Sequence, residues 1–194
     1  MASDRIIFAG VELSSGRKPV TLAGLDEDLN VTRLESWNSS EALVGLEEYG
    51  TILLAINDPS TKPGQQIYTD FKDGLAQVGF KSFLQRNQTR QWLETDAQDC
   101  FLVLGGHKLW PRRTLEGRLQ RSAILYEQGL QLGDPIDVFE EITRYKLIQG
   151  IMPLEKLPTS KELDALVAAY MAWLIMNRPG QVIPKGEFVL PAPE

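Results

Sequence analysis

Several acidic side chains stand where a folded chain rarely tolerates an unpaired charge. Each lies within or beside an apolar segment that is expected to be buried, and ionised carboxylates there are costly unless they are paired or bind a metal. Carboxylate and amide oxygens are ligands that Mg²⁺ and Mn²⁺ prefer. The pattern therefore predicts a divalent-cation site built from some of the carboxylates Glu12, Asp58, Glu94, Asp96 and Asp164, with the amide of Asn57 beside Asp58.

Such a site would favour cleavage of phosphodiesters, because two cations about 4 Å apart stabilise the attacking and leaving oxygens together. Each residue taken alone also fits an ordinary structural role. Asp164 would suit the positive end of a helix dipole, Asp58-Pro59 is a common turn, and Glu12 could form a salt bridge near a strand end. The prediction therefore depends on the residues converging in space.

A basic segment forms the second chemical signal. Five basic residues and one acidic residue, Glu116, fall between positions 108 and 121 of a chain whose net charge is −6. Guanidinium groups suit the geometry of phosphate oxygens, so the segment is expected to bind substrate phosphates. A solvated helix start is the alternative. The basic residues are Lys108, Arg112, Arg113, Arg118 and Arg121.

Several other catalytic and nucleotide-binding motifs are absent from the sequence or match it only in part. The chain has no G-x-G-x-x-G and no G-x-S-x-G sequence. Residues 74–82 resemble a phosphate-binding loop but carry one extra residue before the lysine. Cys100 and His107 could in principle form a thiol–imidazole pair, but a buried cysteine and a surface histidine are the simpler expectation.

Hydrophobic patterning predicts the elements that position these residues. Apolar or alternating segments at 6–13, 20–25 and 31–37, joined by short turns, predict three antiparallel strands. A short helix at 41–48 leads to a fourth strand at 51–57, which is expected to lie parallel to the first strand.

The second half of the chain reads as mostly helical. Asp134-Pro135 predicts a helix start, with the helix ending at Gly150. A capping box at residues 159–162 predicts the start of an apolar helix through Met176. A final strand or extended tail is expected at 181–190. Residues 60–95 give little pattern beyond a strand at 90–95.

Composition limits the class of protein. The chain has 194 residues, 43% hydrophobic and 24% charged, which is typical of a folded domain, and the expectation is one domain over 1–194. The single cysteine excludes a cysteine-based zinc cluster. Neither a signal peptide nor a membrane span is expected, because the longest apolar run, 165–176, is too short. These features predict a cytoplasmic protein.

Five stretches together resemble the family known as domain of unknown function 429, described as predicted nucleases with a ribonuclease H-like fold. Residues 8–12 are similar to the end of its first strand and residues 54–59 to its Ile-Asp-x-Pro segment. Residues 94–97 resemble a Glu-x-His-Pro element, 111–118 a Lys-x-x-x-Glu-Gly-Arg element, and 163–169 a C-terminal helix. The resemblance implies an α/β ribonuclease H-like domain with a mixed sheet, three antiparallel strands and parallel strands beside them, flanked by helices. A helical insertion or extension is expected around 60–160.

The chain departs from that family at its acidic positions. Glu12 and Asn57 stand where the family usually has Asp, and Asp58 is displaced by one residue. Asp96 replaces the family's His and Ala97 its Pro. The resemblance therefore implies Glu12, Glu94 and Asp164 as metal ligands, with Asn57 as a weak carbonyl ligand and Asp58 as a further catalytic carboxylate.

Three functional hypotheses follow. The first is hydrolysis of phosphodiesters with Mg²⁺ or Mn²⁺, the substrate being nucleic acid or a phosphorylated small molecule. The second is a catalytically degenerate ribonuclease H-like module that serves in binding or interaction, motivated by Glu12 and Asn57. The third is a small-molecule phosphotransferase or nucleotide hydrolase. A homodimer is left open, and no membrane partner is expected.

Overall fold

A computed structural model provides the structure of the chain. It describes residues 7–14, 17–47, 52–57, 62–83, 89–150, 156–185 and 188–193, with residues 62–65 described by their backbone only. Every structural statement below refers to these residues. Asp58 lies outside them.

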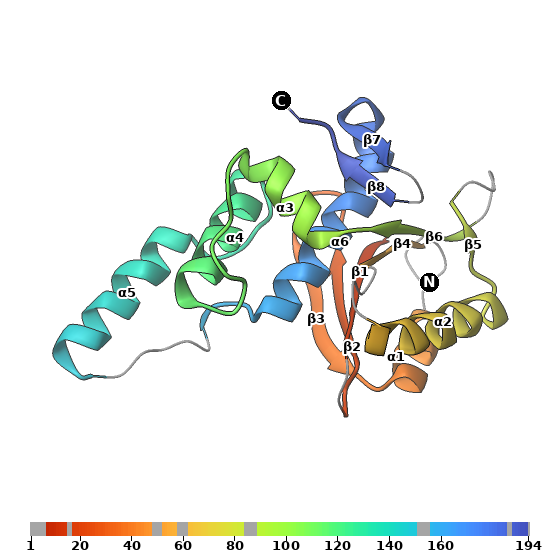
Figure 1. The fold of residues 1–194 in the computed structure, drawn as a ribbon, viewed down its shortest axis with the longest axis horizontal. Helices are drawn as coiled ribbons and strands as arrows, with labels where there is room; N and C mark the ends of the chain where they lie inside the picture. Colours follow the sequence, from red (N-terminus) through yellow and green to blue (C-terminus); the bar gives the residue numbers. More distant parts are fainter. Residues whose placement is uncertain are drawn as a thin grey trace.

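A mixed sheet forms the centre of the fold (Figure 1). Its strands follow the order β3-β2-β1-β4-β6-β8-β7, and the short β5 also pairs with β6. β1, β2 and β3 are antiparallel neighbours, whereas β4 is parallel to β1, and β6 is parallel to β4. The strand bounds are β1 Ile7–Leu13, β2 Val20–Leu25, β3 Val31–Trp37, β4 Ile52–Asn57, β5 Lys81–Ser82, β6 Arg90–Thr95, β7 Val182–Lys185 and β8 Phe188–Pro191.

Helices cover both faces of the sheet. The almost fully buried α6 packs on one face, where its strongest contacts are with β1, β2 and β4. α1 and α2 lie on the other face, and α3, α4 and α5 form a group beyond α6, with α5 projecting from the body (Figure 1). The helix bounds are α1 Ser39–Glu47, α2 Lys62–Gln77, α3 Ala97–Gly105, α4 Leu115–Glu127, α5 Pro135–Ile148 and α6 Ser160–Asn177.

Successive side chains of each strand point to opposite faces of the sheet. This alternation separates two hydrophobic cores and determines which polar side chains lie on the same face. Phe8 of β1 belongs to the core beneath α6, whereas Ala9 belongs to the core on the α1–α2 side. In the parallel register, Glu12 is paired with Asn57 and Asn57 with Thr95. These three side chains therefore belong to the α6 face of the sheet, at the carboxyl ends of three neighbouring parallel strands.

Gly10 allows α6 to lie directly against β1. A Cβ atom at this position would lie 2.0 Å from the Ala165 carbonyl oxygen and 2.2 Å from the Ala169 nitrogen. Real Cβ atoms do not approach backbone that closely, so a side chain here would push the helix away. The close contact falls two residues before Glu12 and one residue after Asp164, and it brings those two carboxylates together.

The fold agrees with the expectation of an α/β domain with a mixed sheet flanked by helices, an arrangement consistent with a ribonuclease H-like fold. The antiparallel β1–β2–β3 meander and the parallel β1–β4 pair are confirmed. The capping box at Thr159 and Glu162 is also confirmed. No described helix has the length and apolar character needed to cross a membrane.

Some elements differ from the expectation. Residues 60–95 hold the long helix α2, and the C-terminal segment forms a β7–β8 hairpin rather than one strand or a tail. The stretch that resembles a phosphate-binding loop is the end of α2, a turn and β5, so it does not form a loop leading into a helix.

Candidate functional site

Glu12 of β1 and Asp164 of α6 form a buried pair of carboxylates, called here the acid pair. Arg112, from the segment between α3 and α4, contacts both of them. Its Nη1 lies 3.1 Å from Asp164 Oδ2, and its Nη2 lies 3.6 Å from Glu12 Oε1. The carboxylate side chains are 6% and 1% exposed, against 35% for Arg112. The guanidinium is therefore the part of this cluster that reaches solvent.

Burial disfavours the ionised form of both Glu12 and Asp164. Desolvation raises the pKa of Glu12, although the Asn57 amide, Arg112 and Lys161 act in the opposite direction. Desolvation and the charge of Glu12 together raise the pKa of Asp164 to about 7, despite Arg112 and Arg121. Burial therefore opposes ionisation of both carboxylates more strongly than the nearby positive charges favour it.

Asp164 also lacks hydrogen bonds that its burial would require. Its Oδ2 atom contacts Arg112 but accepts no hydrogen bond in the described structure, and its Oδ1 is 3.5 Å from the Gln98 side-chain nitrogen. Buried carboxylate oxygens normally accept several hydrogen bonds. An oxygen of this kind is a position for a cation or a polar ligand.

Asn57 has a structural position beside the acid pair. Its Nδ2 donates to Glu12 Oε2, and its Oδ1 accepts a 2.7 Å hydrogen bond from the Ala97 backbone at the start of α3. The side chain thereby ties β1, β4 and α3 together. Its oxygen already accepts one hydrogen bond from a backbone amide, which leaves one lone pair for the carbonyl ligand expected from the sequence.

The segment that carries Arg112 is anchored to α4. A Cβ at Gly117 would lie 2.0 Å from the Pro111 carbonyl oxygen, so glycine permits this close approach. That same oxygen accepts hydrogen bonds from the Thr114 backbone and hydroxyl, and the Thr114 hydroxyl in turn caps α4 by accepting from Gly117 N. Arg112 is therefore held on a short, pinned turn.

The other basic residues of this segment divide into two kinds. Arg118 donates to the Leu157 and Pro158 carbonyls. Arg121 is buried and donates to the Trp110 and Gly117 carbonyls and to Gln98. Both therefore organise the chain, and they are poorly placed for the phosphate binding expected from the sequence. Lys108 and Arg113 are exposed.

Glu94 is not brought to the acid pair. Its strand neighbours Leu93 and Thr95 belong to the α6 face, so Glu94 lies on the opposite face, where it forms a 2.6 Å ion pair with Lys72 of α2. The period of two along a strand determines this separation. The set Glu12, Glu94 and Asp164 therefore does not form one cluster in this structure.

Asp96, Cys100 and His107 have structural contacts. Asp96 caps α3 by accepting from the Asp99 backbone. Cys100 is buried beside the Thr95 hydroxyl, and burial raises the pKa of its thiol to about 12. His107 contacts Gln120 instead. These contacts agree with the simple expectation of a buried cysteine and a surface histidine.

Sequence reasoning missed Gln98, which links the acid pair to Arg121. Its Oε1 accepts from Arg121 Nη2 at 2.9 Å, while its Nε2 faces Asp164. Nothing in the sequence distinguishes this glutamine. The only available signal was its position in the first turn of a helix that follows a parallel strand, where polar side chains meet the edge of the sheet.

The acid pair fits one divalent cation better than two. Among the described residues, no three Asp, Glu, His or Cys side chains are grouped closely enough to surround an ion. Mg²⁺ is commonly held by one or two carboxylates, with waters and substrate phosphates completing its shell. Asp164 Oδ2, buried and without a hydrogen bond, gives Glu12 and Asp164 the donor character that such an ion requires.

Comparison of the sequence with family models gives no match, and comparison with curated proteins gives none either. The ribonuclease H-like interpretation therefore rests on the sequence motifs and on the topology of the sheet.

Proposed function

We propose that this chain is a divalent-metal-dependent phosphodiester hydrolase of the ribonuclease H-like type, with Glu12 and Asp164 as its metal ligands. The observation that carries the proposal is the acid pair itself: two buried carboxylates share a single, partly exposed guanidinium. The pair lies at the carboxyl end of β1 beside the parallel strand β4, and such strand ends are where α/β sheets bind ligands.

In this proposal, Glu12, Asp164 and Asn57 have different roles. Glu12 and Asp164 would hold the cation, while Asn57 keeps the Glu12 carboxylate oriented. A bound Mg²⁺ or Mn²⁺ supplies charge stabilisation and a lowered pKa for water. In the hydrolysis, the water oxygen bonds to phosphorus, the ester P–O bond breaks, the proton of water passes to solvent and the leaving oxygen takes up a proton.

Arg112 has a distinct part in this proposal. In the absence of a metal ion, it supplies the positive charge that the acid pair lacks. A cation held by the acid pair would remove the need for that charge and free the guanidinium. Because Arg112 is the solvent-reaching member of the cluster, it is suited to bind a phosphate of the substrate. Lys108 and Arg113, both exposed, are available to extend that contact.

The proposal is tested by incubating the protein with single-stranded and double-stranded DNA and RNA in the presence of a millimolar concentration of Mn²⁺ or Mg²⁺. We expect cleavage by the wild type, loss of it in Glu12→Gln and Asp164→Asn, and retention in Glu94→Gln. The last variant is the matched control, since Glu94 is a carboxylate on the opposite face of the sheet. Absence of metal-dependent cleavage of all four substrates and of a generic phosphodiester would contradict the proposal.

A second candidate is a ribonuclease H-like binding module without catalysis. Asn57 favours it, because an amide occupies the place of a family carboxylate and both of its polar atoms are engaged within the protein. In that case Arg112 would permanently neutralise the acid pair. Stability that does not respond to Mn²⁺, together with nucleic-acid binding that survives Asp164→Asn, would favour this candidate.

No observation favours the phosphotransferase alternative. The stretch that resembles a phosphate-binding loop ends α2 and enters β5.

A further inference from the structure

Helix α5 exposes an unusual amount of apolar side chain. Ile136, Phe139, Leu147 and Ile148 are 67%, 54%, 79% and 74% exposed, although α5 has only fourteen residues. Figure 1 shows the helix projecting away from the sheet and from α6. A contiguous exposed apolar surface on a globular domain commonly marks an interaction site.

Three of these side chains lie along one stripe of the helix. Ile136, Phe139, Thr143 and Leu147 follow one another at spacings of three, four and four residues, which keeps them on one face. The buried residues of α5, Pro135 and Ile142, lie to one side of this stripe, with Ile142 about 60° around the helix from Phe139. The exposed stripe therefore runs along nearly the whole length of α5, beside the side of the helix that packs on the fold.

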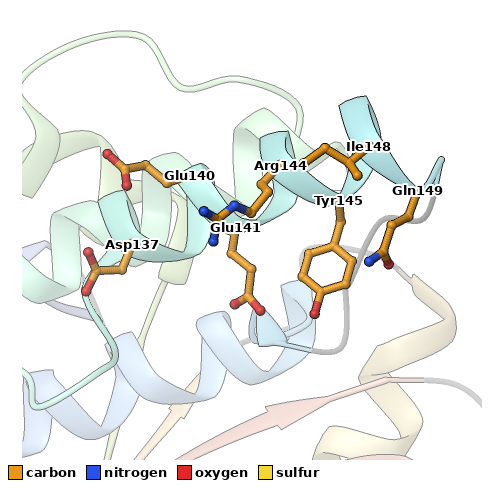
Figure 2. Close-up of a pocket in the computed structure, with 7 residues that line it drawn as sticks. All are labelled: Asp137, Glu140, Glu141, Arg144, Tyr145, Ile148 and Gln149. Carbon is orange, nitrogen blue, oxygen red and sulfur yellow. The ribbon is translucent and has the colours of Figure 1, made fainter.

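The charged residues beside this stripe change sign along the helix, from acidic in its first half to basic in its second half. Asp137 and Glu140 lie in its first half, whereas Arg144 and Lys146 lie in its second half. Figure 2 shows Asp137, Glu140 and Arg144 among the residues that line a groove along α5. Glu140 and Arg144 are exposed, and neither forms an ion pair within the described part of the chain.

We infer that α5 is a self-association surface, on which a second copy of this chain packs its own α5 in antiparallel orientation. A two-fold axis near Ile142 would place Ile136 of one copy against Leu147 of the other. The same operation sets Glu140 of each copy against Arg144 of the other, so two ion pairs flank the apolar contact. Parallel packing would instead bring like charges together, and the charge pattern therefore selects the antiparallel dimer.

The size of this surface sets the expected affinity. A helix of fourteen residues is about 21 Å long, and one helix pair buries less than the ~800 Å² per partner of a standard interface. The dimer is therefore weak, with a dissociation constant on the order of micromolar. This inference is independent of the proposed hydrolase function.

Sedimentation of the full chain over a hundredfold concentration range tests the inference. We expect a shift from monomer to dimer in the wild type, and a dissociation constant at least about tenfold higher in Phe139→Ser. The control is Val44→Ser, which removes a similarly exposed apolar side chain from α1 (60% exposed) and should dimerise as the wild type does. A monomer at all concentrations, or a dimer indifferent to Phe139→Ser, overturns the inference.

Charge reversal tests the pairing of the two copies. Glu140→Lys and Arg144→Glu should each weaken the dimer, because each places like charges across the interface. The double variant Glu140→Lys/Arg144→Glu should restore it. Weakening that the double variant does not restore would contradict the antiparallel arrangement.

Cysteine cross-linking tests orientation independently. Positions 136 and 147 are about 16 Å apart within one helix, too far for an intramolecular disulfide. Ile136→Cys/Leu147→Cys should therefore form a covalent dimer under mild oxidation, whereas Ile136→Cys alone should not. The native Cys100 is buried and does not compete. Cross-linking by Ile136→Cys alone indicates parallel packing and overturns the proposal.

Discussion

Glu12 and Asp164 come from the two ends of the chain and lie on either side of one guanidinium, that of Arg112. The contact depends on Gly10, which lets α6 approach β1 so closely that no side chain fits between them. Two buried carboxylates in this arrangement carry more negative charge than their surroundings favour. Proteins keep such unfavourable groups mainly where function requires them, which is the reason to regard the pair as a site.

Asp164→Asn should make stability less dependent on pH. The pKa of Asp164 in the folded protein is about 7, above the ordinary value of 3.8. A group with a raised pKa contributes its full stabilisation below the lower value and loses it as pH rises through the higher one. In EDTA, the wild type should lose as much as about 4 kcal/mol from this group between pH 4 and pH 8.

The measurement is urea denaturation at pH 5 and pH 8. Asp164→Asn should be more stable than the wild type at pH 8 and should gain little or nothing at pH 5. An unchanged difference between variant and wild type at the two pH values would mean that Asp164 titrates normally in the folded protein.

Arg112→Ala should destabilise the protein in the absence of metal. Removing the guanidinium takes away the one cation in ion-pair contact with the two carboxylates among the described residues, at a cost of about 2 kcal/mol, discounted because Arg112 is itself partly exposed. Mn²⁺ should raise the Tm of Arg112→Ala more than that of the wild type, because a competitor for the acid pair is gone. Arg113→Ala, an exposed neighbour, is the matched control. A Tm of Arg112→Ala that matches this control would refute the role of Arg112.

Asn57→Asp should make stability more dependent on metal. The change removes the amide that donates to Glu12 and adds a third carboxylate beside it, which should cost about 2–3 kcal/mol in EDTA. A divalent cation should offset this loss, so the Mn²⁺-induced rise in Tm should exceed that of the wild type. Asn38→Asp is the control, because Asn38 accepts hydrogen bonds at the exposed start of α1 and an aspartate can accept them too.

Gly10→Ala should destabilise the fold severely, by about 3 kcal/mol or more, because its Cβ would collide with the backbone of α6. Gly133→Ala is the control, since its Cβ would meet nothing within 4 Å. Thermal denaturation of both variants measures the difference. Equal stability would show that α6 does not need this close approach.

Much of the sheet could be predicted from sequence because its strands are locally encoded. The bounds of β2 and β3, Val20–Leu25 and Val31–Trp37, agree with an apolar run, an alternating segment and the turn between them, all of which are visible in the sequence. The parallel β1–β4 pair also agrees with the sequence, because the helix that precedes β4 lets the chain cross over and return beside β1. By contrast, α2 has few apolar residues, and these form a single stripe. The helix is stabilised by packing this stripe against the sheet, which its local sequence does not reveal.

The site was predictable only in part. Glu12 and Asp164 could be found because each is a charge in an apolar segment. The face of the sheet on which Glu94 lies depends on the register of β6. A shift of this register by one residue would place Glu94 on the other face. Arg118 and Arg121 looked like phosphate ligands because sequence cannot reveal backbone carbonyls that a fold brings within reach.

Direct binding of Mn²⁺ at pH 8, followed by the loss of the free-ion electron paramagnetic resonance signal, tests the central claim most directly. The account predicts one bound ion per chain in the wild type and in Glu94→Gln, and none at the same free concentration in Glu12→Gln or Asp164→Asn. Binding that is absent from the wild type, or that both of these variants retain, would contradict the claim that the acid pair holds a metal.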